Sequence, residues 1–470
     1  MKQIVIHLQL NNSNRICILS NAKPHTPMMN WNTLLSAKRF GLEEFHQERH
    51  ENRSEFQRDY DRLVFSAPFR RLQNKTQVFP LPGSIFVHNR LTHSLEVSCV
   101  GRSLGNDVAK GILVRQPELQ HSFLPEIGAI VSAACLAHDL GNPPFGHSGE
   151  RAISTFFSEG KGLALKEQLS ETQWEDFTHF EGNANAFRLL THQFEGRRPG
   201  GFVLTYSTLA SIVKYPFSSS LAGRKSKFGF FASEEESFRR IAEELGMTKL
   251  NERPLKYARH PLVYLVEAAD DICYQMMDIE DAHKLKILTT DETKDLLLSY
   301  FDDARKAHRE ETLKIVSDVN EQIAYLRSSV IGLLIRECTQ AFLDHEEQIL
   351  AGTFEGPLIR HISPLPASAY RHCSEVSQEK IYRSRDVLDI ELAGFRIIGT
   401  LLELMIEAVC SPEKAYSKLL INRVSNQYKI KSPVFYERIQ TVLDYISGMT
   451  DVFALDLYRK INGNSLPEIS

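Results

Sequence analysis

The sequence lacks any run of about 18 apolar residues, the length that a membrane-spanning helix needs. Its first ten residues, MKQIVIHLQL, are interrupted by His7 and Gln9, and no small-residue cleavage site follows, so we expect no signal peptide. The seven cysteines are an odd number and include no CxxC pair, which is typical of reduced thiols. These features predict a soluble, cytoplasmic protein that has no membrane partner.

Charge of one sign and chain-breaking residues are also scarce. Lysine plus arginine (55) nearly balances aspartate plus glutamate (59), so any anionic ligand must be held by a local cluster of cations. Glycine (25) and proline (19) are few for 470 residues, which favours helix. Hydrophobic residues at 42% exclude a largely disordered chain.

Apolar residues recur at helical spacing through most of the chain. Strand-like stretches are few and short, and Gly- and Ser-rich loops occupy 195–201 and 217–233. The pattern predicts an all-α protein, one large helical body with inserted loops and a helical C-terminal region. Helices are expected over 91–113, 126–139, 147–156, 183–192, 260–279, 310–350, 386–410, 412–420 and 434–461.

Histidines and aspartates with the chemistry of metal ligands occur at three places. His138 and Asp139 are adjacent at the end of a predicted apolar helix, immediately before a Gly-Asn-Pro-Pro turn. His93 lies upstream in an amphipathic helix, and Asp270 lies downstream in EAADDI. This ligand set suits Mn²⁺ or Mg²⁺, with Fe²⁺, Ni²⁺, Co²⁺ or Zn²⁺ as alternatives. A His-Asp pair alone is commonly just a hydrogen-bonded pair at a helix end.

Helical geometry favours Asp270 over Asp271 as the fourth ligand. Asp270 lies beside the apolar stripe of its helix, whereas Asp271 is expected to point nearly opposite, toward solvent. Tyr274 and Asp278 follow Asp270 at i+4 and i+8, so all three share one flank. This row predicts a pocket wall, although a solvated helix face is the ordinary alternative. The stripe consists of Leu262, Leu265, Val266, Ala269, Ile272, Cys273 and Met276.

His147 and Glu150 have the spacing of an acid/base pair. If 147–157 is helical, the two side chains share a face and the carboxylate is expected to hydrogen-bond the imidazole, which raises its basicity. Arg90 stands three residues before His93, and Lys214 lies in ASIVKYP. Cations near a divalent ion fit a polyphosphate, although a surface salt bridge is the commoner role of each.

Several familiar sites are excluded at the level of motifs. The sequence contains no GxxxxGK[ST], no GxGxxG and no GxSxG, so a P-loop, a Rossmann site and a nucleophile elbow are not expected. Gln77, in NKTQVF, offers both a donor and an acceptor for a sugar hydroxyl or a base.

The pattern His93, His138-Asp139, Asp270 reproduces the H…HD…D signature of the HD-domain metal-dependent phosphohydrolases. Six longer segments resemble the deoxyguanosine triphosphate triphosphohydrolases, in that family's order, over nearly the whole chain. The most specific is HDLGNPPFGHSGE. The six are FRRLQNKTQVF (69–79), RLTHSLEV (90–97), AHDLGNPPFGHSGE (137–150), HFEGNANAFRL (179–189), EAADDICYQMMDIEDA (267–282) and DYISGMTDVFALDLYRKI (444–461).

The resemblance implies a large all-α fold with a flexible lead-in (1–28), an HD catalytic core (29–290) and a helical region (291–470) that contributes to the nucleotide site and to a homo-oligomer. It implies hydrolysis of a deoxynucleoside triphosphate, by preference dGTP, to the deoxynucleoside and inorganic triphosphate. A second dNTP as effector, or single-stranded DNA, is a further possible partner. A broad-specificity dNTPase, an HD enzyme for a nucleoside monophosphate or an alarmone, and a nucleotide- or ssDNA-binding HD sensor are the alternatives.

The resemblance also implies roles for individual residues. His93, His138, Asp139 and Asp270 would bind the metal, and His147, oriented by Glu150, would be the acid/base residue. The substrate would be bound by Gln77, Tyr274 and Asp278 around the deoxyribose, by Arg90, Asn183 and Lys214 at the phosphates, and by a basic residue of the C-terminal region, Arg423 or Lys418.

Overall fold

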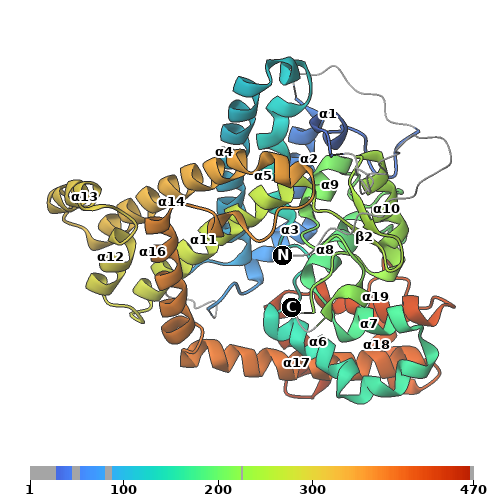
Figure 1. Cartoon of the computed structure of the whole chain (residues 1–470). Helices are drawn as coiled ribbons and strands as arrows, with labels where there is room; N and C mark the ends of the chain where they lie inside the picture. The colour runs from blue at the N-terminus through green and yellow to red at the C-terminus, as the bar shows by residue number, and fades with distance from the viewer. Residues whose placement is uncertain (1–27, 45–52, 80–86, 224–225, 466–470) are drawn as a thin grey trace, which may run out of the picture.

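The computed structural model describes residues 28–44, 53–79, 87–223 and 226–465. The predicted lead-in lies outside this range except for Met28, as does Cys17. The described residues are mainly helical, with loops between the helices and one two-stranded antiparallel ribbon of β1 (Lys249–Asn251) and β2 (Lys256–Tyr257) (Figure 1). The all-α prediction is confirmed. The six described cysteines form no disulfide.

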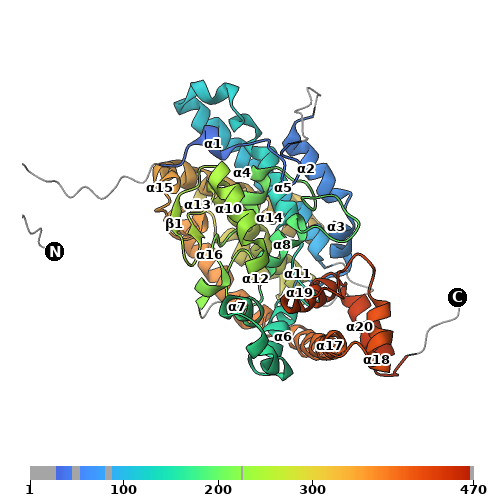
Figure 2. The same ribbon diagram turned by 90° about the vertical axis from the view of Figure 1, so that its right-hand side faces the viewer.

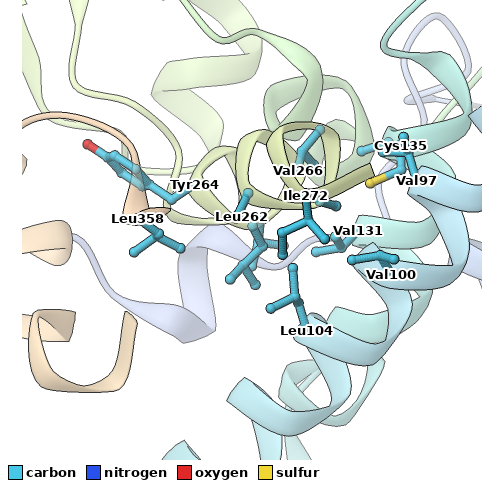
Figure 3. Packing of buried hydrophobic residues seen from close by; sticks show 14 of the residues in the cluster. Val97, Val100, Leu104, Val131, Cys135, Leu262, Tyr264, Val266, Ile272 and Leu358 are labelled. Atoms are coloured by element: carbon cyan, nitrogen blue, oxygen red, sulfur yellow. The ribbon is translucent and has the colours of Figure 1, made fainter. Parts of the chain in front are cut away.

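Helix α5 (Ile127–Ala137) lies at the centre because its sequence, IGAIVSAACLA, is apolar on every side. It packs closely along α4 (Arg90–Arg115), and glycines permit the close approach. A Cβ atom built on Gly105 would lie 2.8 Å from the Cα of Gly128. Helix α11 (Pro261–Lys284) crosses both and presents apolar residues of the predicted stripe to them, as Figure 3 shows for Leu262 and Ile272.

Two clusters of buried apolar side chains stabilise the molecule. The first surrounds α4, α5 and α11 and extends through 290–387. The second joins α6 (His147–Ser158) and α7 (Glu171–Thr178) to the last four helices, so an early segment packs beside a late one (Figures 1 and 2). The predicted domain boundary at residue 290 stays a prediction. The two clusters of buried apolar side chains do not divide at that residue. The late helices are α17 (Arg385–Cys410), α18 (Ala415–Arg423), α19 (Phe435–Ser447) and α20 (Asp451–Ile461).

Most predicted helices are present, and two were predicted too long. The stretch 310–350 is divided because Asp318 caps a new helix, α14, and 434–461 is divided because Thr450 caps α20. No helix in the described ranges is long and apolar enough to cross a membrane. The remaining helices are α1 (Trp31–Leu34), α2 (Glu55–Val64), α3 (Ala67–Arg71), α8 (Gly182–Thr191), α9 (Tyr206–Ile212), α10 (Glu235–Glu244), α12 (Thr290–Leu298), α13 (Asp303–Ile315), α14 (Val319–Asp344), α15 (Glu346–Leu350) and α16 (Pro364–Val376).

Candidate active site

Three of the four predicted metal ligands meet where α4, the end of α5 and α11 converge. The Nε2 atoms of His93 and His138 lie 3.1 Å and 3.5 Å from Oδ1 of Asp270. One ligand atom from each residue lies within 4.8 Å of the other two. Helical packing thus brings together side chains separated by up to 177 positions in the sequence.

The contacts that both imidazoles make through Nδ1 direct Nε2 of each ring toward Asp270. Nδ1 of His138 lies 2.6 Å from the carbonyl oxygen of Cys135 and donates to it. Nδ1 of His93 lies 3.5 Å from the sulfur of Met277, a weak acceptor. Both Nε2 atoms therefore face Asp270, so that the two imidazoles and the carboxylate converge on one point. This arrangement fits a divalent ion.

Asp139 stands beside this group rather than within it. Its Oδ1 lies 3.7 Å from Nε2 of His138 and accepts a 2.5 Å hydrogen bond from Asn142. Its Oδ2 accepts a 2.7 Å hydrogen bond from Nη1 of Arg90. Arg90 therefore holds the Asp139 carboxylate at the edge of the cluster, and this buried ion pair uses one end of its guanidinium.

The charges of the cluster are balanced internally. Burial raises the pKa of Asp270, but His138 and His93 outweigh it and hold that pKa well below its usual range. Burial lowers the pKa of His138, but Asp139 and Asp270 outweigh it and raise that pKa to about 9. The carboxylates thus favour a positive charge at this point, which a divalent cation would supply.

The turn after Asp139 places His147 over the cluster. Gly141 is required because a Cβ atom there would lie 2.1 Å from backbone atoms of Gly182 and Ala186. Phe145 and Gly146 both have positive φ, 60° and 55°, which reverses the chain so that His147 begins α6. Burial lowers the pKa of His147, and nearby Arg90 and Lys227 lower it further. His147 is therefore neutral at neutral pH.

The predicted hydrogen bond between His147 and Glu150 is wrong. The Oε1 atom of Glu150 instead accepts a 2.8 Å hydrogen bond from the backbone N–H of Gly182. Glu150 is buried, which raises its pKa, although Lys227 acts in the opposite direction. The carboxylate therefore fixes the start of α8 against α6.

Tyr274 lines a second cavity, as predicted, whereas Asp278, one turn further along α11, is buried and is not among the residues that line either cavity. The hydroxyl of Tyr382 donates to Oδ2 of Asp278 at 2.5 Å, and its ring centroid lies 6.1 Å from that of Tyr274. Oε1 of Gln77 is buried without a hydrogen-bond partner and so is available to a ligand. This cavity has a volume of about 450 Å³. Its polar walls include Gln77, His147, Arg151, Tyr274, Tyr370, Ser374, Gln378, Tyr382 and Glu391.

The metal-ligand cluster opens into a smaller, charged cavity of about 270 Å³. Lys214 lines it and lies 3.1 Å from Glu267, while Asn183 donates to Glu181 at 2.9 Å. Sequence reasoning missed Lys227, which also lines this cavity and donates to Glu181 at 2.6 Å. It also missed Glu267, although that residue precedes Asp270 by three positions and so extends the same row.

One expectation about a charged residue is not met. Asp271 is only partly exposed rather than directed into solvent, and burial raises its pKa to about 7. Arg423 and Lys418 are exposed on α18 and do not line either cavity of a single copy of the chain, so their role at the phosphates stays a prediction. Lys75 is buried and donates to the carbonyl oxygens of Asn142 and Ser447, which ties these loops together.

The C-terminal region stabilises two walls of the candidate active site. Asp451, the first residue of α20, accepts hydrogen bonds from the backbone N–H groups of Thr76, at 2.8 Å, and Phe145, at 2.9 Å. Both segments line the larger cavity. One carboxylate near the end of the chain therefore fixes two walls of a site whose ligands come from its first three hundred residues.

Comparison with known proteins agrees with this geometry. The HD domain family model matches residues 90–254, and the phosphohydrolase-associated domain model matches 362–460. A deoxyguanosinetriphosphate triphosphohydrolase-like protein of Pseudomonas aeruginosa is 38% identical over 93% of this chain and 100% of its own length, and one of Synechocystis is 39% identical with the same coverage.

A protein of Yersinia enterocolitica named deoxyguanosinetriphosphate triphosphohydrolase is 30% identical over 90% of this chain and 96% of its own length. With these relatives matched almost from end to end, the chain is a hydrolase that belongs to the deoxyguanosine triphosphate triphosphohydrolase family of HD-domain phosphohydrolases.

Proposed function

We propose that this protein hydrolyses deoxynucleoside triphosphates, with dGTP as the preferred substrate, to the deoxynucleoside and inorganic triphosphate. The observation that carries the proposal is that the charged cavity and the larger polar cavity share Gln77, His147 and Tyr274 as lining residues. A triphosphate in the first and a nucleoside in the second would place the bond between the 5′ oxygen and the α-phosphate beside His147.

His93, His138, Asp139 and Asp270 would hold the divalent ion, Mn²⁺ or Mg²⁺ by preference. When bound, the ion would neutralise charge on the α-phosphate and polarise its P–O bonds. Arg90 keeps Asp139 in place, and Lys214, Lys227 and Asn183 would bind the triphosphate oxygens. This assignment is supported by the position of all three side chains in the walls of the charged cavity.

His147 would move the proton. Because burial and two nearby cations keep the pKa of His147 low, its neutral imidazole is ready to accept a proton from the attacking water. Water attacks the α-phosphorus, the bond to the 5′ oxygen breaks, and the proton returns to that oxygen. Asp278 would accept a hydrogen bond from the 3′-hydroxyl, and Tyr274 would crowd a 2′-hydroxyl, which favours deoxyribose.

The base preference rests on the far wall of the larger cavity. Arg151 and Glu391 form an ion pair of 2.8 Å there, so that a cationic donor and an anionic acceptor stand side by side. Guanine offers N–H donors and carbonyl and ring acceptors on adjacent edges, and it therefore matches this pair better than adenine does. Cytoplasmic location and homo-oligomeric assembly are parts of the same proposal.

Product analysis tests the proposal. The protein is incubated with Mn²⁺ or Mg²⁺ and with each dNTP and GTP, singly and mixed, and products are separated by anion exchange. We expect intact triphosphate and deoxyguanosine from dGTP, and none from an Asp270→Asn variant. Triphosphate release from several dNTPs tested singly would indicate broad specificity instead of a dGTP preference. Triphosphate release only from mixtures would indicate activation by a second nucleotide. Nucleotide or ssDNA binding without any triphosphate release would favour the sensor.

A further inference from the structure

The first turn of α6 carries residues of two proposed roles, proton transfer and recognition of the base. His147 lines both the charged cavity and the larger cavity, and Arg151 lines the larger cavity at the wall proposed to bind the base. Arg151 follows His147 by four positions, so the two side chains lie on one face of the helix, one turn apart. A shift of this turn would therefore move both groups together.

The start of α6 has no side-chain cap among the described residues. Its N-cap residue is Gly146, which makes no capping hydrogen bond through a side chain. The first N–H groups of an α-helix lack a partner within the helix, and a glycine has no side chain that could accept from them. The position of this turn, and with it that of His147, therefore depends on contacts with other elements.

Helix α17 makes such contacts on both sides of His147. The hydroxyl of Ser148, which is 3% exposed, donates a 2.6 Å hydrogen bond to the backbone carbonyl of Glu391. Two residues before His147, Phe145 lies so close to α17 that a Cβ atom built on Gly394 would be 2.5 Å from the Cβ of Phe145. Helix α17 therefore contacts the chain just before and just after the proposed acid/base residue.

Glu391 also reaches α6 through its side chain. Its Oε1 atom lies 2.8 Å from Nη2 of Arg151, and the two side chains are 38% and 55% exposed. An ion pair with this exposure contributes little to stability, so each group can exchange its partner for a ligand at low cost. The backbone of Glu391 is thus attached to α6, while its carboxylate is available to a base in the larger cavity.

We propose that Glu391 couples recognition of the base to the position of His147, so that base selectivity appears in kcat and not only in KM. The inference rests on the proposed function and concerns the same site. Guanine presents two adjacent N–H donors, N1–H and the 2-amino group, to the carboxylate and its O6 atom to the guanidinium of Arg151. It therefore bridges α17 and α6 and holds the first turn of α6 in place. Adenine has a ring acceptor where guanine has N1–H, so it does not form this bridge.

Steady-state kinetics with dGTP, dITP and dATP test the coupling. We expect kcat of the wild type to fall from dGTP through dITP, which lacks the 2-amino group, to dATP. Glu391→Gln keeps the backbone carbonyl but loses the anionic acceptor, and it should lower the ratio of kcat for dGTP to kcat for dATP about tenfold. Glu403→Gln, at an ion pair of α17 with Lys161 that lines neither cavity, is the matched control and should leave this ratio unchanged.

Removal of the backbone link separates a positioning role from direct contact with the base. Ser148→Ala should lower kcat about tenfold for dGTP and less for dATP, because only guanine acts through the link. The dissociation constant of deoxyguanosine should change less than about twofold, since the carboxylate is still present. Ser158→Ala, at a hydroxyl that donates to Ser154 in the last turn of α6, is the control and should change neither quantity.

Two kinetic results would overturn the proposal. One is a wild type whose base selectivity lies entirely in KM, and the other is a Ser148→Ala variant that slows dGTP and dATP by the same factor. The second result would show that Ser148 only stabilises the fold of α6.

Hydrogen exchange measures the same coupling without turnover. Deoxyguanosine should slow amide exchange in residues 147–151 of the wild type about tenfold, deoxyadenosine should not, and Glu391→Gln should abolish the difference. Equal protection by both nucleosides, or protection by neither, would contradict the coupling. Because this measurement needs no hydrolysis, a failure of the coupling is distinguished from a failure of the proposed function, which product analysis detects.

Discussion

Glu267 holds Lys214 at the wall of the charged cavity, with its Oε1 atom 3.1 Å from Nζ. The same carboxylate meets Arg259 through Oε2 at 2.9 Å. Glu267 is buried and lies one turn before Asp270 on α11. It therefore fixes the position of the Lys214 ammonium group relative to the predicted metal ligands. We regard Glu267 as a positioning residue for the triphosphate.

Replacing Glu267 with Gln should raise KM for dGTP about tenfold with a smaller change in kcat, because Lys214 loses its anchor. In a Lys214→Met background the same change should have little further effect, since the side chain that it positions is absent. Steady-state kinetics of the wild type, the two single variants and the double variant measure this coupling. Glu243→Gln, at an exposed pair with Lys249, is the control. Fully additive effects would contradict the positioning role.

The pH dependence of the reaction should report on Lys227. If neutral His147 accepts the proton, as we propose, kcat/KM should rise as pH increases through the pKa of His147, which lies below its ordinary value. Lys227→Met removes a positive charge that lowers this pKa. The acid limb should therefore move to higher pH, whatever the loss in absolute rate. Lys227→Arg keeps the charge and should leave the limb in place; an unmoved limb in the Met variant would refute the assignment.

A buried ion network that joins α8 to α19 should contribute strongly to stability. Arg188 donates to both oxygens of Asp444 at 2.7 Å and to Glu234 at 2.6 Å. Arg188→Met leaves two buried carboxylates without their cation, which should cost about 3–5 kcal/mol of the free energy of unfolding. Urea denaturation should show a much lower midpoint. Arg53→Met, which breaks an exposed pair with Asp61, should change stability by less than about 1 kcal/mol.

Gly394 should be intolerant of any side chain. Its Cβ would overlap Phe145, so Gly394→Ala should cost about 1–3 kcal/mol and also lower kcat by displacing the turn that carries His147. Gly332→Ala is the matched control on α14, because the nearest atom to its Cβ is 3.7 Å away. That variant should be neutral or gain up to about 1 kcal/mol. If Gly394→Ala and Gly332→Ala had the same effect on the melting temperature and on kcat, the close contact between Gly394 and Phe145 would be contradicted.

Much of the fold follows from local pattern. Helices α4, α5 and α11 are correctly predicted because apolar periodicity and caps are properties of short segments. The grouping of His93, His138 and Asp270 follows from the family signature and is present in the structure. The preference for Asp270 over Asp271 follows from the helical wheel and agrees with the cluster.

What sequence reasoning missed depends on packing between distant segments. Glu150 contacts the backbone of residue 182 and not its helical neighbour His147, and no local spacing indicates this. Lys227 comes from a Gly- and Ser-rich loop with no periodicity, so its place in the charged cavity is set by tertiary contacts alone. Arg423 was expected near the phosphates, but one copy of the chain leaves it outside.

The two hydrogen bonds that Asp451 accepts also have a consequence for folding while the chain is being synthesised. A ribosome releases the chain from its N-terminus, and the metal ligands therefore leave the exit tunnel long before α20 does. Until Asp451 emerges, the backbone N–H groups of Thr76 and Phe145 lack their acceptor, and the walls of the nucleotide site are not fixed. A nascent or prematurely terminated chain should thus be inert toward the nucleotide pool, and hydrolysis should begin only with nearly complete synthesis.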